Sequence, residues 1–186
     1  MKASLIALCL TISAGLAGAE TCPQAGDHSV VIARLVEAIR VAPDARAARE
    51  ISNDMWALWT DAPDEKAQML LDRGMTRRAE LDLVGALQDF KALVDYCPNY
   101  DEGYNQRAFV NFIRKDYTSA LVDLGRVLEA SPAHLGALSG RALTLIALGR
   151  DREAQQDLRM AVILNPWLPE RVLLQPERSN ADDPDL

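Results

Sequence analysis

Apolar residues recur along this chain at spacings of three and four, the period of helices with one buried face. Before residue 63 there are two such stripes, one from Val31 to Ala42 and one from Ala48 to Leu58, separated by Pro43. Beyond residue 66 the same spacing continues, without the strict alternation that a β-strand would show. The pattern therefore predicts helices throughout and no sheet. In this second part the expected helices span 67–80, 83–97, 101–114, 117–130, 135–148 and 151–164.

The second part also repeats itself with a period of 34 residues, marked by Pro98, Pro132 and Pro166. Small residues stand 24 and 12 positions before each proline, and apolar residues stand eight and five positions before it. The small residues are Gly74, Ala108 and Ala142, then Ala86, Ala120 and Ala154; the apolar ones are Phe90, Leu124 and Leu158, then Leu93, Val127 and Ala161. Small residues let two helices lie close together, bulky ones fill the space between pairs, and each proline ends a helix.

This register resembles that of the tetratricopeptide repeat, whose unit of about 34 residues carries W-x2-L-G-x2-Y, then A-x3-F, then P. The resemblance covers residues 67–166 and implies an all-α fold, a right-handed α-solenoid of antiparallel helix pairs. Its three units would be 67–100, 101–134 and 135–168. Two positions depart from the pattern: the leucine is replaced by Arg73, Arg107 and Arg141, and the tyrosine by Arg77, Asn111 and Leu145. The aliphatic stem of an arginine can still cover apolar surface.

The segments that flank the repeats are expected to cover the ends of the stack. Residues 20–28 form a linker, and residues 29–62 form a degenerate helical pair that caps the N-terminal end. Residues 167–175 supply a short apolar cap at the C-terminal end, because a solenoid needs a cover over its last unit. Residues 176–186, rich in aspartate, are expected to be a disordered acidic tail.

Residues 1–19 have the composition of an export signal peptide. Lys2 precedes an apolar run from Ala3 to Leu16, and Ala17-Gly18-Ala19 has the small-x-small pattern of a cleavage site. The alternative is an uncleaved anchor helix, although the run is shorter than the ~20 residues that span a bilayer. We expect cleavage, a soluble periplasmic product and no membrane insertion afterwards. In this respect the chain is similar to the small exported tetratricopeptide proteins of proteobacteria.

The composition narrows the classes of partner and of chemistry. The chain is 49% apolar and 25% charged with a formal net charge of −7, the profile of a soluble globular protein. This acidity argues against nucleic acid, whose phosphates need a basic face, and no polybasic cluster is present for an anionic membrane. No nucleotide-binding or hydrolase motif occurs, and His28 and His134 stand alone. We therefore predict no enzyme, no metal site and no cofactor.

The cysteines bear on the compartment. Cys9 lies in the expected export signal, which leaves Cys22 and Cys97. An even pair in an oxidising compartment can form one disulfide, and residues 22–29 are long enough, if extended, to bring Cys22 near the end of the helix at Cys97. The alternative is two free thiols, with Cys97 packed at a helix end. The sequence leaves both open.

The resemblance to tetratricopeptide repeats also implies a binding groove, lined by the first helix of each unit. Carried over by their spacing from each proline, the groove-facing positions are Gln68, Leu71, Met75, Arg78 and Ala79, then Glu102, Asn105, Phe109, Phe112 and Ile113, then Gly136, Ser139, Leu143, Ile146 and Ala147. The candidates for peptide contact are Leu71, Met75, Arg78, Asn105, Phe109, Phe112, Leu143 and Ile146, with Phe109 and Phe112 as central anchors. The same apolar side chains could instead pack neighbouring first helices together.

The carboxylate clamp of this family, which holds acidic chaperone C-termini, needs basic and amide residues. Its positions correspond here to Leu71, Met75, Gln106, Gly136 and Gly140, none of which is charged. The resemblance therefore implies a non-catalytic scaffold or adaptor of the cell envelope that binds an apolar or amphipathic protein segment. Two alternatives remain. One is a periplasmic holdase chaperone for exported clients, and the other is a structural subunit that forms a homodimer by filling its groove with a second copy.

Overall fold

The computed structural model describes residues 21–176, and within this range the regular structure is helical, with no β-strand. The helices are α1 (Ser29–Arg40), α2 (Ala45–Trp59), α3 (Glu65–Ala79), α4 (Leu83–Tyr96), α5 (Asp101–Ile113), α6 (Tyr117–Ala130), α7 (Leu135–Ala147), α8 (Asp151–Leu164) and the 3-10 helix η1 (Pro169–Leu173). The expected export signal, 1–19, and all but the first residue of the expected acidic tail, 176–186, lie outside the described residues.

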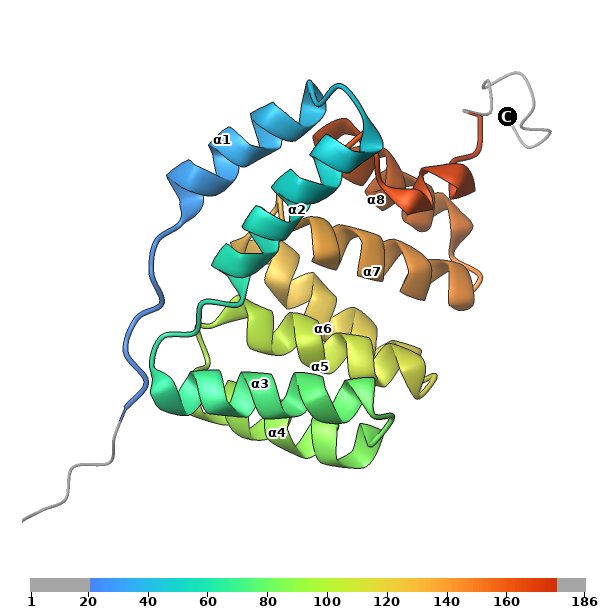
Figure 1. Cartoon of the computed structure of the whole chain (residues 1–186). Coiled ribbons are helices and arrows are strands. Elements are labelled where there is room, and N and C mark those ends of the chain that lie inside the picture. The colour runs from blue at the N-terminus through green and yellow to red at the C-terminus, as the bar shows by residue number, and fades with distance from the viewer. Residues whose placement is uncertain (1–20, 177–186) are drawn as a thin grey trace, which may run out of the picture.

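The helices from α3 to α8 form three antiparallel pairs that follow one another in chain order (Figure 1). Each helix predicted in this part is present, within two residues of its expected bounds. The first helices of the pairs also touch one another, because α3 contacts α5 and α5 contacts α7. They therefore form one continuous row. The predicted all-α architecture of tandem helix pairs is confirmed.

Small residues lie where the paired helices cross. The alanines at these crossings are all fully buried: Ala86, Ala108, Ala120, Ala142 and Ala154. In the first unit the crossing is tighter still, because a Cβ atom added to Gly74 would lie 2.6 Å from Cε1 of Phe90. A side chain at this position would displace the Phe90 ring, which is fully buried in the core. The 34-residue pattern of small and bulky residues is thus the pattern of helix contact.

The arginines that replace the consensus leucine pair with aspartates of the second helix in each unit. Arg73 donates to Asp89, Arg107 to Asp123 and Arg141 to Asp157. All three aspartates are buried. Because a buried carboxylate is costly without a partner, each pair ties together the two helices of its unit.

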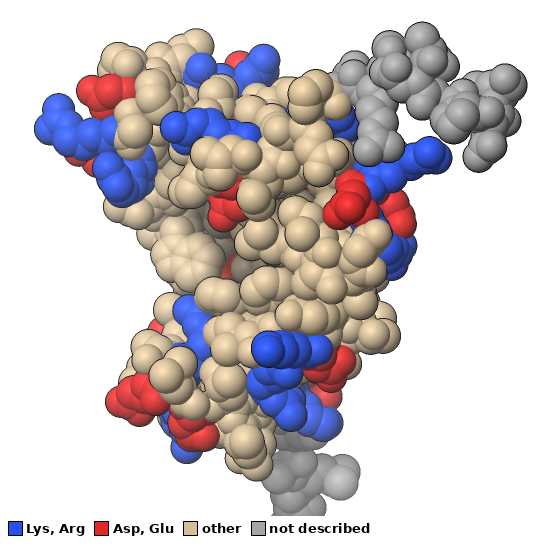
Figure 2. Space-filling model, turned by 90° about the vertical axis from the view of Figure 1, so that its right-hand side faces the viewer, with Lys and Arg blue, Asp and Glu red and all other residues tan. Residues whose placement is uncertain are grey.

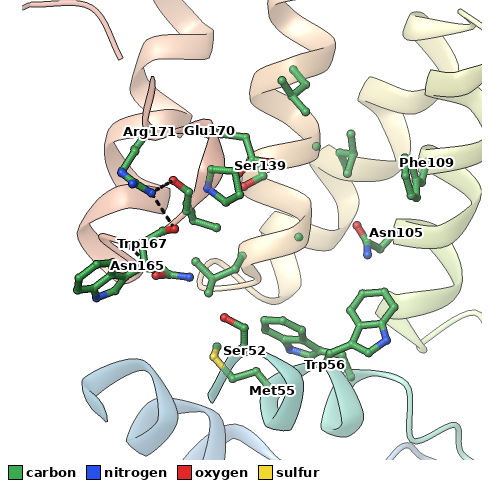
Figure 3. Close-up of a pocket in the computed structure, with 18 of the residues that line it drawn as sticks. Ser52, Met55, Trp56, Asn105, Phe109, Ser139, Asn165, Trp167, Glu170 and Arg171 are labelled. Carbon is green, nitrogen blue, oxygen red and sulfur yellow. Dashed lines mark hydrogen bonds between the residues drawn. The ribbon is translucent and has the colours of Figure 1, made fainter. Parts of the chain in front are cut away.

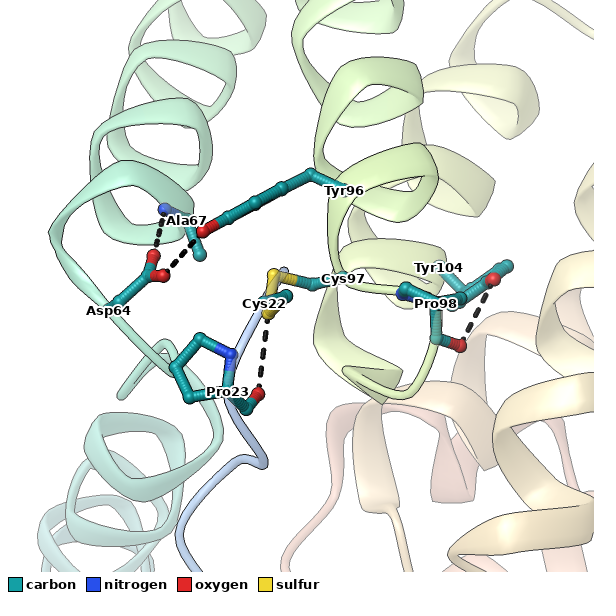
Figure 4. Close-up of a disulfide and its surroundings, with 8 residues drawn as sticks. All are labelled: Cys22, Pro23, Asp64, Ala67, Tyr96, Cys97, Pro98 and Tyr104. Carbon is teal, nitrogen blue, oxygen red and sulfur yellow. Dashed lines mark hydrogen bonds between the residues drawn. A yellow bond between two sulfur atoms is a disulfide. The ribbon is translucent and has the colours of Figure 1, made fainter. Parts of the chain in front are cut away.

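A disulfide joins Cys22 to Cys97, with 5.1 Å between the two Cα atoms (Figure 4). It fastens the linker that precedes α1 to the end of α4. Next to it, the hydroxyl of Tyr96 donates to Asp64 at 2.7 Å, which ties the end of α4 to the start of α3. The structure therefore contains the bridge rather than two thiols.

The N-terminal helical pair does not cap the stack at α3, and this prediction was wrong. Instead, α1 packs against α8, and in Figure 1 the pair lies beside α7 and α8. Val36 of α1 and Met55 of α2 share one buried apolar cluster with Leu135, the first residue of α7. The pair therefore folds back toward the last unit.

Contacts at the end of α2 fix this placement. The ring of Trp59 stacks on that of His134, with centroids 4.2 Å apart. The hydroxyl of Tyr100, at the start of α5, donates to the Trp59 carbonyl at 2.7 Å. An apolar stripe such as that of α2 shows that a helix is buried, but it does not show against which neighbour. This is why the sequence alone misplaced the pair.

The C-terminal segment forms the 3-10 helix η1, which packs against α8. The amide of Gln155 on α8 donates to the Leu173 carbonyl at 3.0 Å and accepts from the Gln175 N–H at 2.8 Å. Among the described residues, none of the helices is both long and apolar enough to cross a membrane. The same residues contain no group of three or more His, Cys, Asp or Glu side chains that could hold a metal ion.

Candidate binding cleft

The placement of α2 closes one side of the row of first helices and leaves a cleft of about 870 Å³ between them. Its walls are α2, α5, α7 and the segment from Asn165 to Val172. Figure 3 shows these walls around the open space, with Met55 and Trp56 on one side, Phe109 on another, and Trp167 and Glu170 on a third. In the space-filling view of Figure 2 the molecule is hollowed between its upper and lower parts, and most of the surface around the hollow is neither acidic nor basic.

The α2 wall presents one helical face to the cleft. Its lining residues are Ala45, Ala48, Arg49, Ser52, Met55, Trp56 and Trp59. They follow the three- and four-residue spacing that brings side chains to one side of a helix. Met55 is fully buried, whereas Trp56 and Trp59 are half-buried and keep surface within reach of a ligand.

The opposite wall comes from the first helices of the second and third units. Its residues from α5 are Asn105, Gln106, Ala108, Phe109 and Phe112, and those from α7 are Leu135, Gly136, Ser139, Gly140, Leu143 and Thr144. Phe109 is 47% exposed, which is high for so large an apolar side chain. Phe112 is half-buried, because its ring also packs against the core between α5 and α6 and lies 5.6 Å from that of Tyr117.

The cleft gathers five of the ten aromatic residues of the chain. Aromatic residues make up only 5% of the sequence, yet all three tryptophans and two of the three phenylalanines line this one space. The third phenylalanine, Phe90, is fully buried in the core. Tryptophan and other aromatics are the residues that most often carry binding energy at protein interfaces.

Beneath the α5 wall lies a buried polar network centred on Glu102, which is 2% exposed. The side-chain amides of Asn105 and Gln106 donate to its carboxylate, and His134 Nε2 lies 3.1 Å from its Oε2. His134 Nδ1 accepts the backbone N–H of Ala137 at 3.2 Å, so Nε2 carries the proton and donates to Glu102. The network holds the start of α7 against α5.

Arg78 of α3 extends this network toward the cleft. Its guanidinium donates to the side-chain oxygen of Gln106 and lies over the ring of Phe109, with Cζ 4.6 Å from the ring centroid. Burial lowers the pKa of Arg78, and the Glu102 carboxylate opposes that shift. Arg78 thus supports one face of Phe109, while the rest of that ring remains accessible.

Two buried polar atoms of the cleft lining have no hydrogen-bond partner among residues 21–176. They are Oγ of Ser139 on α7 and Oε2 of Glu170 on η1. Ser139 is only 8% exposed. Atoms of this kind are rare in folded proteins and require an explanation.

Four of the eight candidates for peptide contact line the cleft: Asn105, Phe109, Phe112 and Leu143. The prediction is wrong for Leu71, which is fully buried in the core. Met75, Arg78 and Ile146 are half-buried and lie outside the cleft lining. Leu71, Asn105 and Ser139 share one position of the repeat, and all three are buried.

Other lining residues were not identified as site residues from the sequence, above all Trp56, Trp59, Trp167 and Glu170. They lie outside the six helices of the repeats, so the helical pattern counted from the prolines could not place them. One signal was available, because every tryptophan of the chain lies outside the six helices of the repeats.

Comparisons with known proteins show which repeat the sequence resembles and which solved structures share its fold. No family model matches the chain. The chain is 30% identical over 109 residues to a TPR repeat-containing protein of Rhizobium etli, an alignment that covers 59% of this chain and 53% of that protein. It is 37% identical over 70 residues to a tetratricopeptide repeat protein 36 homolog of Nematostella vectensis, covering 38% of each. The chain thus spans about half or less of the length of these curated relatives.

Two solved structures share the architecture. The first TPR of Spaghetti (RPAP3), bound to the HSP90 peptide SRMEEVD, superposes with a TM-score of 0.57 at 22% identity and covers 59% of this chain and 86% of that one. The TPR2AB domain of yeast Sti1, in a complex with pHSP90, gives a TM-score of 0.53 at 19% identity and covers 72% of this chain and 54% of that one. The chain therefore has the fold of a tetratricopeptide-repeat solenoid and is similar in sequence to proteins that contain this repeat.

Proposed function

We propose that this protein is a non-catalytic adaptor that binds a peptide or protein segment in the cleft between α2, α5 and α7. The observation that carries the proposal is the concentration of all three tryptophans and two phenylalanines around one open, largely apolar space. A cleft of about 870 Å³ lies in the range of ligand-binding sites. The two similar solved structures hold HSP90 partners, which supports a peptide-binding role for this fold.

The ligand class differs from that of those two neighbours. The five positions that correspond to the carboxylate clamp are Leu71, Met75, Gln106, Gly136 and Gly140, and none can neutralise a carboxylate. Leu71 is fully buried as well. The proposed ligand is therefore an apolar or amphipathic segment rather than an acidic chaperone C-terminus.

The proposed compartment is the cell envelope, with the protein soluble in the periplasm after export. The composition of residues 1–19 supports export. The disulfide between Cys22 and Cys97 also supports it, because such bonds persist in oxidising compartments.

The test is affinity capture from an envelope extract with three forms of the protein: the parent, Phe109→Ala and Val122→Ala. Phe109 and Val122 are both exposed apolar residues of the repeats, but only Phe109 lines the cleft. An adaptor that uses the cleft loses its partner in Phe109→Ala and keeps it in Val122→Ala. Capture of the same proteins by all three forms would contradict the proposed function. A partner range as broad as that of a general chaperone would instead favour the holdase alternative.

A further inference from the structure

Helices α1 and α2 form a strap, residues 29–59, and both ends of this strap are attached to the first repeat. At its beginning, Cys22 of the preceding linker is bonded to Cys97, the residue that follows α4. At its end, α2 continues through residues 60–64 into α3. Between these two attachments the strap reaches the last unit, where α1 packs against α8 (Figure 1).

The strap is less well buried than the helices that it faces. Two of 12 residues are buried in α1 and two of 15 in α2, whereas α5 and α7 each bury seven of 13. One face of α2 lines the open cleft instead of packing against a neighbouring helix. Elements with few buried apolar contacts open locally at a low cost in free energy. The strap is therefore the part of the cleft that opens most easily.

The two ends of the strap are held in different ways. At the end of α2, the Trp59 ring stacks on His134 and the Trp59 carbonyl accepts the hydroxyl of Tyr100. At the other end, none of the linker residues 21–28 is buried. His28 Nε2 lies 3.1 Å from Asp61 Oδ2, but this pair is open to water, where ion pairs contribute little. The covalent bond is thus the main attachment of the linker.

We propose that the Cys22–Cys97 disulfide is a redox-controlled tether of the cleft. The bonded form holds the α2 wall in place, and reduction by a dithiol releases the strap. Because α2 supplies Trp56 and Trp59 to the lining, the released form has lost one aromatic wall of the site. The consequence for partner binding rests on the proposed function, whereas the release of the strap does not.

The bridge is approachable from the side of the linker. Cys97 is 1% exposed, whereas Cys22 is half-buried among exposed neighbours. A thiolate of the dithiol attacks Sγ of Cys22, and Cys97 leaves as a thiolate. The second thiol of the reductant then displaces Cys22 from the mixed disulfide. The products are two cysteine thiols and the cyclic disulfide of the reductant, so two electrons and two protons have passed to the protein.

This tether makes the state of the cleft depend on the compartment. Protein thiols stay reduced in the cytosol, and disulfides form and persist outside it. A chain that has not yet been oxidised therefore has a loose α2 wall and a weak site. Oxidation completes the wall, which restricts tight binding to the exported form of the proposed function.

The experiment is hydrogen–deuterium exchange of the full chain, read by mass spectrometry, with and without a small dithiol. After reduction we expect the amides of α1 and α2 to exchange at least tenfold faster, while those of α5–α8 stay protected over the same minutes. Cys22→Ser should show the fast strap with or without the dithiol. Arg107→Leu is the matched control, because it removes an ion pair with Asp123 inside the middle repeat and keeps the bridge. Without reductant, its strap should exchange as slowly as that of the parent.

Equal protection of α1 and α2 in both redox states would overturn the proposal, because the strap would then hold without its bond. A simultaneous loss of protection in the strap and in α5–α8 would also overturn it, because the bridge would then hold the whole fold. Affinity capture without reductant tests the effect on the site. Cys22→Ser should retain at least tenfold less partner than the parent, and equal capture would overturn redox control of binding. If the parent itself captures nothing through Phe109, the proposed function fails, while the exchange rates still decide whether the bridge holds the strap.

Discussion

Arg107 and Asp123 join the two helices of the middle repeat through two parallel hydrogen bonds, from Nε to Oδ2 at 2.8 Å and from Nη2 to Oδ1 at 2.7 Å. The hydrogen bond to Asp123 raises the pKa of Arg107, so the guanidinium stays charged. The same pair recurs in the third repeat, where Arg141 binds Asp157 at 2.7 Å through each nitrogen. An arginine in place of the consensus leucine therefore comes with an aspartate 16 residues later.

Restoring the consensus leucine at this position should destabilise the protein. Arg107→Leu leaves Asp123 buried without its cation, and removing one partner of a buried pair costs about 3 kcal/mol. The double variant Arg107→Leu, Asp123→Asn should recover part of the loss, because the remaining side chain is uncharged. Urea unfolding followed by circular dichroism measures both.

The control for this substitution is Arg40→Leu, which removes an exposed ion pair with Glu37 at 3.3 Å. Exposed pairs contribute about 0–1 kcal/mol. If Arg107→Leu and Arg40→Leu unfold at the same urea concentration, the repeated ion pair has no structural importance.

Breaking the Cys22–Cys97 disulfide should lower stability by about 4 kcal/mol in the chain-entropy model, since the bridge spans 75 residues. Urea unfolding of Cys22→Ser, compared with that of the oxidised parent, measures the loss. A reducing agent should shift the parent curve toward that of the variant and leave the variant curve unchanged. Coincident curves for parent and variant without reductant would show that the bridge does not form in the purified protein.

Acid stability should depend on Asp64, which caps α3. The Ala67 N–H donates to its carboxylate at 2.8 Å and the Tyr96 hydroxyl at 2.7 Å, and these bonds lower the pKa of Asp64 below its ordinary 3.8. A carboxylate with a lowered pKa adds stability above its unfolded pKa and loses it as the pH falls through the folded value.

The stability of the parent should therefore fall more steeply below about pH 4 than that of Asp64→Asn, which caps the helix but does not titrate. Urea midpoints measured from neutral pH to pH 2.5 for both proteins provide the comparison. Parallel curves over the whole range would show that Asp64 makes no contribution to acid unfolding.

The repeated part of the fold could be predicted because its pattern of proline, small and bulky residues recurs every 34 positions. Pro98, Pro132 and Pro166 set the register, and every small residue counted from them lies at a helix crossing. The position of α2 could not be predicted in this way. Its stripe from Ala48 to Leu58 predicts a buried face, but the partner of that face depends on contacts that do not recur, such as Trp59 on His134.

The sequence predicted residues of the candidate site only at positions that recur from one repeat to the next. Phe109 and Leu143 hold the same repeat position, and both line the cleft. Met75 holds that position in the first unit, but it lies outside the lining, to which α3 contributes no residue. The walls contributed by α2 and by the C-terminal segment have no repeat to reveal them.

Phe109 and Phe112 were treated alike from the sequence, and the structure now separates them. Phe109 is 47% exposed in the cleft, with Arg78 against one face of its ring. Phe112 also lines the cleft, but its ring packs against the buried cluster that includes Leu124 and Leu138. The first is expected to serve binding alone, and the second to serve both binding and stability.

Phe109→Ala should therefore weaken capture of the partner by about 2 kcal/mol, the loss typical of an aromatic anchor, with a nearly unchanged Tm. Phe112→Ala should weaken capture and also lower the free energy of unfolding by about 2–3 kcal/mol, less than for a fully buried phenylalanine because its ring is half exposed. Both quantities must be measured on each variant, since unfolding alone also reduces capture. A Phe109→Ala protein that melts far below the parent would show that the ring is part of the core. One that melts normally and binds its partner undiminished would exclude this face of α5 from the site.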